Sequence, residues 1–124
     1  MVDIVRIATH ISDLNDCQLI AKILIKLGYR VFLNLMQIDS LQSAKLSDAV
    51  YQINEWGNIE VFYFADSFGN LNNQSIDNII NTIKPVWDGE IGIHAHDNKG
   101  HALVNSLGAI DSGVTYVDAT ILGM

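Results

Sequence analysis

The fold of this chain is best approached from residues 91–100, which read IGIHAHDNKG. Apolar residues followed by polar residues and glycine predict a strand that gives way to a loop. Side chains two positions apart on a strand project from one face, so His94 and His96 are expected to lie together. Two neighbouring imidazoles can bind one divalent cation, with Asp97 and Asn98 close by to contribute oxygens or supporting hydrogen bonds. The same pattern also fits two strand histidines that only hydrogen-bond to their neighbours.

Composition limits the class of protein and its partners. With 124 residues, 49% hydrophobic and 17% charged, the sequence predicts one globular domain over residues 1–124 with a substantial core. Its net charge of −7 opposes nucleic acid and acidic membrane surfaces as partners. No targeting segment or membrane-crossing run is apparent. The single cysteine, Cys17, is predicted to be a core residue in a reducing, cytoplasmic environment.

Strand and helix patterns alternate along the whole chain. Apolar runs that end in polar residues or glycine predict strands at residues 4–8, 30–36, 59–65, 91–96 and 116–121. Helical spacing of apolar residues predicts helices between them, closed in turn by Gly28, Gly57, Pro85 and Gly113. For the first of these helices, Ser12 or Asp13 is the expected cap.

This alternation implies a parallel sheet with crossover helices, because parallel neighbours need a long connection. Two architectures fit the pattern: a complete open sheet with helices on both faces, or five consecutive units of an eight-unit barrel. Residues 8–12 read ATHIS, so the first strand is not followed by a glycine-rich phosphate loop. The absence of such a loop weakens the hypothesis of a nucleotide-binding open sheet, but it does not decide between the two architectures.

Several motifs resemble one family. HAHDNKG at residues 94–100, ALVNS at 102–106 and VDATILGM at 117–124 resemble the last third of the barrel in the metal-dependent aldolase and lyase superfamily. That superfamily includes 4-hydroxy-2-oxovalerate aldolase, HMG-CoA lyase, and the isopropylmalate and homocitrate synthases. VRIATH at 5–10 and ADSFG at 65–69 resemble earlier strand ends, the first being most similar to the hydroxy-oxovalerate aldolase branch. The resemblance implies a partial (β/α)8 TIM barrel: strands four to eight, parallel and in sequence order, with all helices on the outer face.

The same resemblance implies an activity and a site. The activity is divalent-metal-dependent cleavage of a carbon–carbon bond in a 4-hydroxy-2-oxo acid through a metal-stabilised enolate. His94 and His96 would be the metal ligands, for Mn or Mg, with Co or Zn as alternatives. The residues expected to face a small 2-oxo acid substrate are His10, Asp66, Ser67 and Asn98. Asp118 and Thr120 flank the end of the last predicted strand without an assigned role.

Parts of the family pattern have no counterpart in this sequence. The carboxylate that completes the metal site, and the arginine beside it, come from an early strand that cannot be matched here, and no general base can be located. The chain is therefore expected to be an inactive fragment of an enzyme, with no catalytic residue assigned. An acyl-CoA-condensing synthase and a non-catalytic metal-binding or interaction domain remain alternatives. An open inner face and two unpaired sheet edges would favour a homo-oligomer.

Overall fold

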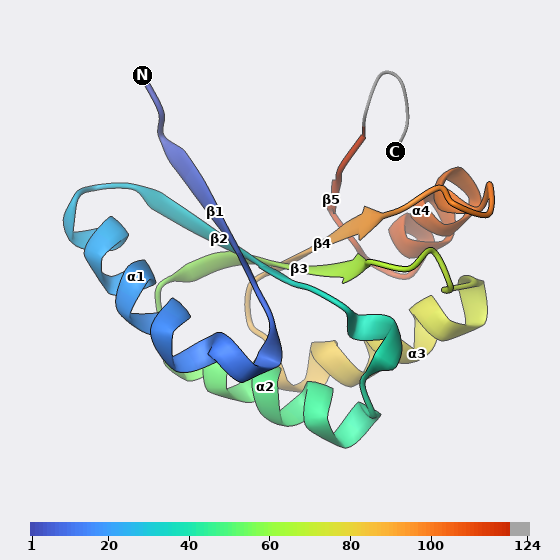
Figure 1. The fold of residues 1–124 in the computed structure, drawn as a ribbon, viewed down its shortest axis with the longest axis horizontal. Helices are drawn as coiled ribbons and strands as arrows, with labels where there is room; N and C mark the ends of the chain where they lie inside the picture. Colours follow the sequence, from blue (N-terminus) through green and yellow to red (C-terminus); the bar gives the residue numbers. More distant parts are fainter. Residues whose placement is uncertain (120–124) are drawn as a thin grey trace.

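The computed structural model describes residues 1–119, and Figure 1 shows strands and helices that alternate throughout. The strands are β1 (Ile4–Thr9), β2 (Arg30–Leu35), β3 (Ile59–Asp66), β4 (Glu90–Ala95) and β5 (Tyr116–Val117). The helices between them are α1 (Leu14–Lys26), α2 (Ser43–Glu55), α3 (Asn73–Ile83) and α4 (Ala102–Asp111). Short 3-10 turns occur at Ile11–Asp13, Ile38–Ser40 and Lys84–Val86.

The five strands form one parallel sheet in the order β1-β2-β3-β4-β5. The register aligns Ile7 with Leu33, Leu33 with Phe62, and Phe62 with Ile91. Successive right-handed crossovers that run in one direction keep their helices on one side of the sheet. This order confirms the barrel-type arrangement and excludes the open sheet with helices on both faces.

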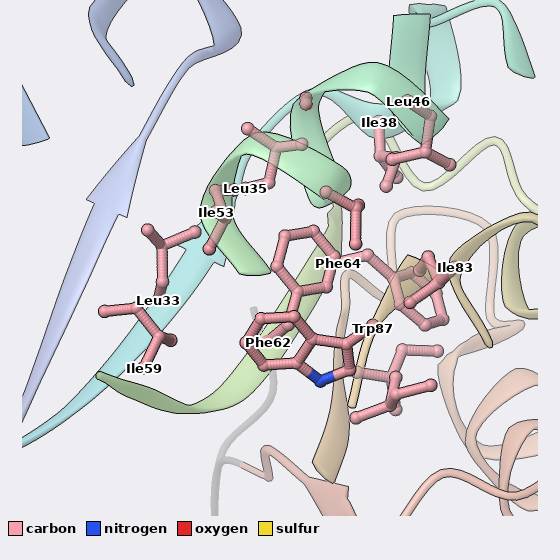
Figure 2. Packing of buried hydrophobic residues seen from close by; sticks show 14 of the residues in the cluster. Leu33, Leu35, Ile38, Leu46, Ile53, Ile59, Phe62, Phe64, Ile83 and Trp87 are labelled. Atoms are coloured by element: carbon pink, nitrogen blue, oxygen red, sulfur yellow. The ribbon is translucent and has the colours of Figure 1, made fainter. Parts of the chain in front are cut away.

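One face of the sheet packs against the helices to form the main core (Figure 2). Phe62, Phe64 and Ile93 project from the strands into this layer and are fully buried. All four helices contribute side chains to it, among them Cys17 from α1, Val50 and Ile53 from α2, Ile76, Ile80 and Ile83 from α3, and Ala109 from α4. Each fully buried large apolar side chain stabilises the fold by about 1.5–3 kcal/mol. This layer therefore holds the helices against the sheet.

The opposite, inner face of the sheet carries a smaller aromatic cluster. Phe32, Val61 and Tyr63 are at most 6% exposed, and Tyr116 packs against them. Phe32 of β2 meets Tyr116 of β5 edge to face at 5.5 Å between ring centroids, although β2 and β5 are not neighbours in the sheet. The expectation of an open inner face is thus wrong for this part of the chain. Strong sheet curl lets large aromatic rings span the concave side.

Most differences from the predicted elements lie at their ends. The predicted strand 91–96 begins at Glu90 and ends at Ala95, so His96 is the first residue of the loop. Within the described residues β5 is only Tyr116–Val117; Thr120 and Ile121 lie outside them. Asp13 occupies the N-cap position of α1 but makes no side-chain cap hydrogen bond. Across residues 1–119, no helix has both the length and the apolar character needed to cross a membrane.

Candidate metal centre

His94 and His96 lie side by side at the carboxyl end of β4. Their ring centroids are 5.1 Å apart and the ring planes meet at 67°. Both side chains are partly buried. They flank a cavity of about 280 Å³ that also touches Asp97, Leu103 and Ser106. The loop after β4 and the start of α4 therefore form one wall of a pocket that contains both imidazoles.

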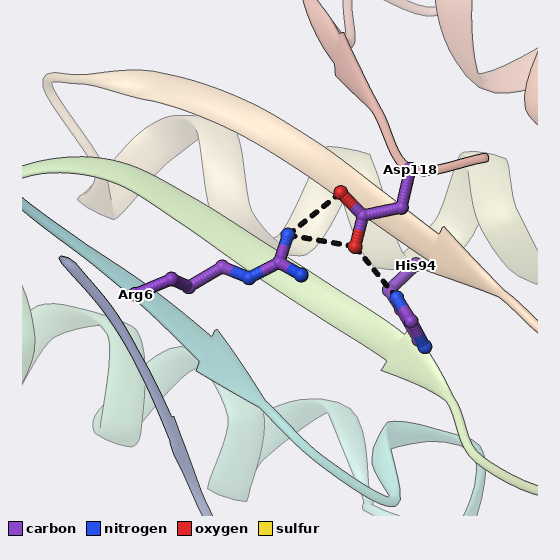
Figure 3. Close-up of polar contacts among 3 residues, drawn as sticks. All are labelled: Arg6, His94 and Asp118. Atoms are coloured by element: carbon purple, nitrogen blue, oxygen red, sulfur yellow. Dashed lines mark hydrogen bonds and ion pairs between the residues drawn. The ribbon is translucent and has the colours of Figure 1, made fainter. Parts of the chain in front are cut away.

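His94 forms a network with two further side chains, Asp118 and Arg6 (Figure 3). His94 Nδ1 lies 2.6 Å from Asp118 Oδ2, just after β5. Arg6 Nη1, from β1 at the far edge of the sheet, lies 2.6 Å from both carboxylate oxygens of Asp118. The curl of the sheet is what lets a side chain of the first strand reach one that follows the last.

The guanidinium of Arg6 also contacts an aromatic ring. It lies 4.6 Å from the centroid of the Tyr63 ring, a cation–π distance. Tyr63 in turn lies over Gly92 of β4. The aromatic cluster of the inner face thus supports the Arg6–Asp118 pair.

The charge state of Asp118 follows from these contacts. Burial by itself would raise the pKa of the Asp118 carboxyl. The hydrogen bonds from Arg6 and His94 outweigh burial, so the pKa is lowered below its ordinary value. The pKa of Arg6 is raised, chiefly by its hydrogen bond to Asp118. Arg6 and Asp118 therefore form a cation and an anion at neutral pH.

The donor set fits part of a metal site. Imidazole nitrogens suit a borderline divalent cation, and a carboxylate on the remote nitrogen of a ligating histidine is the usual support for such a ligand. No group of three or more His, Cys, Asp or Glu side chains within residues 1–119 is arranged to hold a metal. Asp118 is already paired with His94 Nδ1 and Arg6. His94 and His96 thus fit as two ligands of a centre that needs a further donor.

Asp66 and Ser67 lie in the loop after β3 and make local contacts. Asp66 is 1% exposed, and its two carboxylate oxygens accept hydrogen bonds from the backbone N–H groups of Asn70 and Leu71, at 2.9 and 3.1 Å. Ser67 Oγ accepts from the backbone N–H of Gln37 at 2.9 Å. Gln37 has a left-handed backbone with φ of 57°, so this bond helps to hold an unfavourable conformation. Both side chains shape the rim of the sheet.

Asn98 belongs to the loop after β4, which is tied to the loop after β3. Asn98 Nδ2 donates to the Phe68 carbonyl at 3.5 Å, and Lys99 Nζ donates to Asn70 Oδ1 at 2.7 Å. His10 follows β1 on the same rim, with β2 and β3 between its strand and β4. The structure therefore brings Asn98 next to the Asp66–Ser67 loop, whereas no hydrogen bond or ring contact joins His10 to the histidine pair in the described structure.

Sequence reasoning missed the roles of Arg6 and Asp118. A signal for Arg6 was present, since it is the one charged residue in the apolar run at residues 4–8. By strand alternation, Arg6 lies on the face of the sheet opposite the helices, and so do Gly92 and His94. Its pairing with Asp118 spans 112 residues and depends on sheet curl, which no local pattern encodes.

A curled parallel sheet in sequence order, with helices outside and polar groups at the strand ends, defines a barrel-type α/β protein. The chain belongs to the HMGL-like family, whose model matches residues 3–124. It is 31% identical over 121 residues to a 4-hydroxy-2-oxovalerate aldolase of Carboxydothermus hydrogenoformans, covering 98% of this chain and 36% of that protein. The chain thus spans about a third of the length of the curated relatives it matches.

Solved structures share the fold. The N-terminal domain of a proposed aldolase from Bacteroides vulgatus superposes with a TM-score of 0.84 at 30% identity, over 99% of this chain and 41% of that one. HMG-CoA lyase from Brucella melitensis superposes with a TM-score of 0.83 at 13% identity, over 95% of this chain and 49% of that one. At 13% identity the second comparison shows the fold alone.

Proposed function

We propose that this chain provides two ligands of the metal centre in an aldolase-type lyase acting on a 4-hydroxy-2-oxo acid. The observation that carries the proposal is the His94–His96 pair, backed by Asp118 and open to a cavity. Membership of the HMGL-like family and similarity to 4-hydroxy-2-oxovalerate aldolases support this reaction class.

In this proposal the site would hold a divalent cation, Mn or Mg with Co or Zn as alternatives, which when bound would supply Lewis acidity toward the 2-oxo group of the substrate. His94 and His96 would hold the cation. Leu103 and Ser106 line the adjoining cavity, where they would bound the space for a small 2-oxo acid. Asn98 remains a candidate substrate contact; its amide lies against the loop after β3, where it donates to the Phe68 carbonyl.

The other substrate-contact candidates take indirect parts in the proposal. Asp66 is buried with both oxygens engaged, so it supports the rim by holding residues 70–71 in place. Ser67 does the same for Gln37. His10, at the end of β1, remains a candidate for the distal end of a substrate.

A second candidate function is metal binding without turnover. For the isolated chain, the His94–His96 pair would be enough for weak binding of a cation. A synthase that condenses an acyl-CoA with a 2-oxo acid would use a similar site, and substrate choice separates it from the lyase.

Retro-aldol activity tests the proposal. Pyruvate release from 4-hydroxy-2-oxovalerate with Mn is measured for the isolated chain and for the full-length product of its gene. We expect no turnover by the isolated chain, because catalysis needs a preorganised set of groups that two histidines do not complete. We expect turnover by the full-length product that is lost in His94→Ala and kept in His101→Ala. A full-length product that is inactive on this substrate but condenses acetyl-CoA with a 2-oxo acid would favour the synthase.

We also propose that the chain acts in the cytoplasm.

A further proposal is that the chain associates with copies of itself. Two apolar surfaces are exposed on the outer helices. One lies on α1 and its C-cap residue, at Leu19, Ile20, Ile23 and Leu27. The other lies on α4, at Leu103, Val104, Leu107 and Ile110. Each of these residues is at least 49% exposed. Contiguous exposed apolar surface favours association.

A further inference from the structure

We propose that Asp118 is a positioning residue that fixes His94 as the Nδ1–H tautomer, and that Arg6 anchors Asp118 for this task. The inference rests on the proposed function, because it concerns how His94 is prepared to bind a metal. Asp118 would touch neither metal nor substrate; it would act only through His94.

The geometry determines which nitrogen carries the proton. A neutral imidazole has one N–H donor and one acceptor nitrogen. Asp118 is a carboxylate, which can only accept, and its Oδ2 lies 2.6 Å from His94 Nδ1. The proton must therefore be on Nδ1 for this contact to be a hydrogen bond. The lone pair is then on Nε2, which points away from Asp118 in Figure 3.

Arg6 keeps the carboxylate in that orientation. Its Nη1 contacts both oxygens of Asp118, while Tyr63 supports the guanidinium from its ring face. Without Arg6, Asp118 would be a partly exposed carboxylate free to rotate toward water, since its side chain is 23% exposed. The anchor comes from β1 and the histidine from β4, so the arrangement also depends on the curl of the sheet.

The arrangement suits a histidine that ligates through Nε2. Carboxylate partners of ligating histidines set the tautomer and ring orientation, and their loss typically lowers metal affinity by about 10- to 100-fold. His96 has no such partner among the hydrogen bonds of residues 1–119, which makes it the internal reference for the tautomer of His94.

The test measures the tautomer directly, in the metal-free chain. Nitrogen-15 NMR at pH 8.5 reports, for each imidazole, which ring nitrogen carries the proton. We expect His94 to show a protonated Nδ1 in the wild type and to shift toward Nε2–H in Asp118→Ala, with a smaller shift in Arg6→Met. Asp111→Ala, an exposed aspartate at the end of α4, should leave the tautomer unchanged.

Two results would overturn the inference. One is a wild-type His94 that carries its proton on Nε2, a result that needs no variant and so does not depend on Asp118→Ala folding. The other is a folded Asp118→Ala protein with an unchanged tautomer. Zn titration of the same samples separates this inference from the proposed function. A wild type that binds no Zn would contradict the metal function, whereas the tautomer result would still decide the role of Asp118.

Discussion

Tyr63 lies so close over Gly92 that a Cβ atom at residue 92 would come within 2.5 Å of its ring. The bare backbone of β4 at this point lets the ring lie against the sheet, where it carries the guanidinium of Arg6 at 4.6 Å. Gly92, two residues before His94, thus determines how closely the Tyr63 ring can approach β4. Through Tyr63 it also determines the position of Arg6, which holds Asp118.

Replacing this glycine tests that relationship. Gly92→Ala should lower the free energy of unfolding by about 1–3 kcal/mol, because an overpacked site must shift a ring or a strand. Urea unfolding measures the loss. In the Tyr63→Ala background the same substitution should cost much less, because the clashing ring is gone. An equal cost in both backgrounds would contradict the packing relationship.

Asp66 offers a test of the loop that forms the neighbouring rim. Asp66→Ala leaves the N–H groups of Asn70 and Leu71 without their acceptor, and an unpaired buried donor such as that of Leu71 costs about 1–3 kcal/mol. We expect a large loss of stability and faster proteolysis within residues 67–72. Ser67→Ala, which removes a single acceptor at a partly exposed position, is the matched comparison and should cost less. A mild Asp66→Ala variant would mean that the loop does not depend on this carboxylate.

Asp39 should make stability fall as pH rises through the acidic range. Burial raises the pKa of its carboxyl, and the nearby Asp66 carboxylate raises it further; no hydrogen-bond partner of its oxygens is found in the described structure. A folded pKa above the unfolded one means that the folded state binds more protons, so stability is lost as pH rises through the folded pKa.

Asp39→Asn removes this charge. The variant should be more stable than the wild type at pH 7, by about 1 kcal/mol or less because the side chain keeps some contact with solvent. Urea unfolding from pH 3 to pH 7 should show a flatter profile for it, while Asp111→Asn should keep the wild-type profile. A lower stability of Asp39→Asn at pH 7 would contradict this account.

Self-association should depend on the exposed apolar surface of α4. We expect light scattering to show a concentration-dependent rise in mass for the wild type, and a smaller rise when Leu107 and Ile110 are both changed to Glu. Gln52→Glu, at an exposed position of α2, controls for added charge. A wild type that stays monomeric at every concentration would remove the proposal of a homo-oligomer.

The sequence predicted the order and type of the elements because each strand and helix has its own periodicity, as in the runs at 59–65 and 76–83. It predicted that His94 and His96 project together because strand alternation is local. It did not predict the contact between Arg6 and Asp118, or the burial of Phe32 and Tyr63, since both depend on how far the sheet curls. The sequence also did not predict that the Asp66 carboxylate accepts hydrogen bonds from its own loop, because Asp-Ser shortly before a glycine fits a turn and a functional site equally well.

Metal binding by the isolated chain tests the central claim most directly. In calorimetric titration with Mn or Zn we predict weak, saturable binding at one site, since residues 1–119 place no third donor beside the two imidazoles and so leave coordination positions to water. Affinity should fall at least about 10-fold in both His94→Ala and His96→Ala, while His101→Ala, which alters an exposed histidine at the start of α4, should bind as the wild type does. Absence of saturable binding, or binding that neither site variant alters, would contradict the assignment of His94 and His96 as metal ligands.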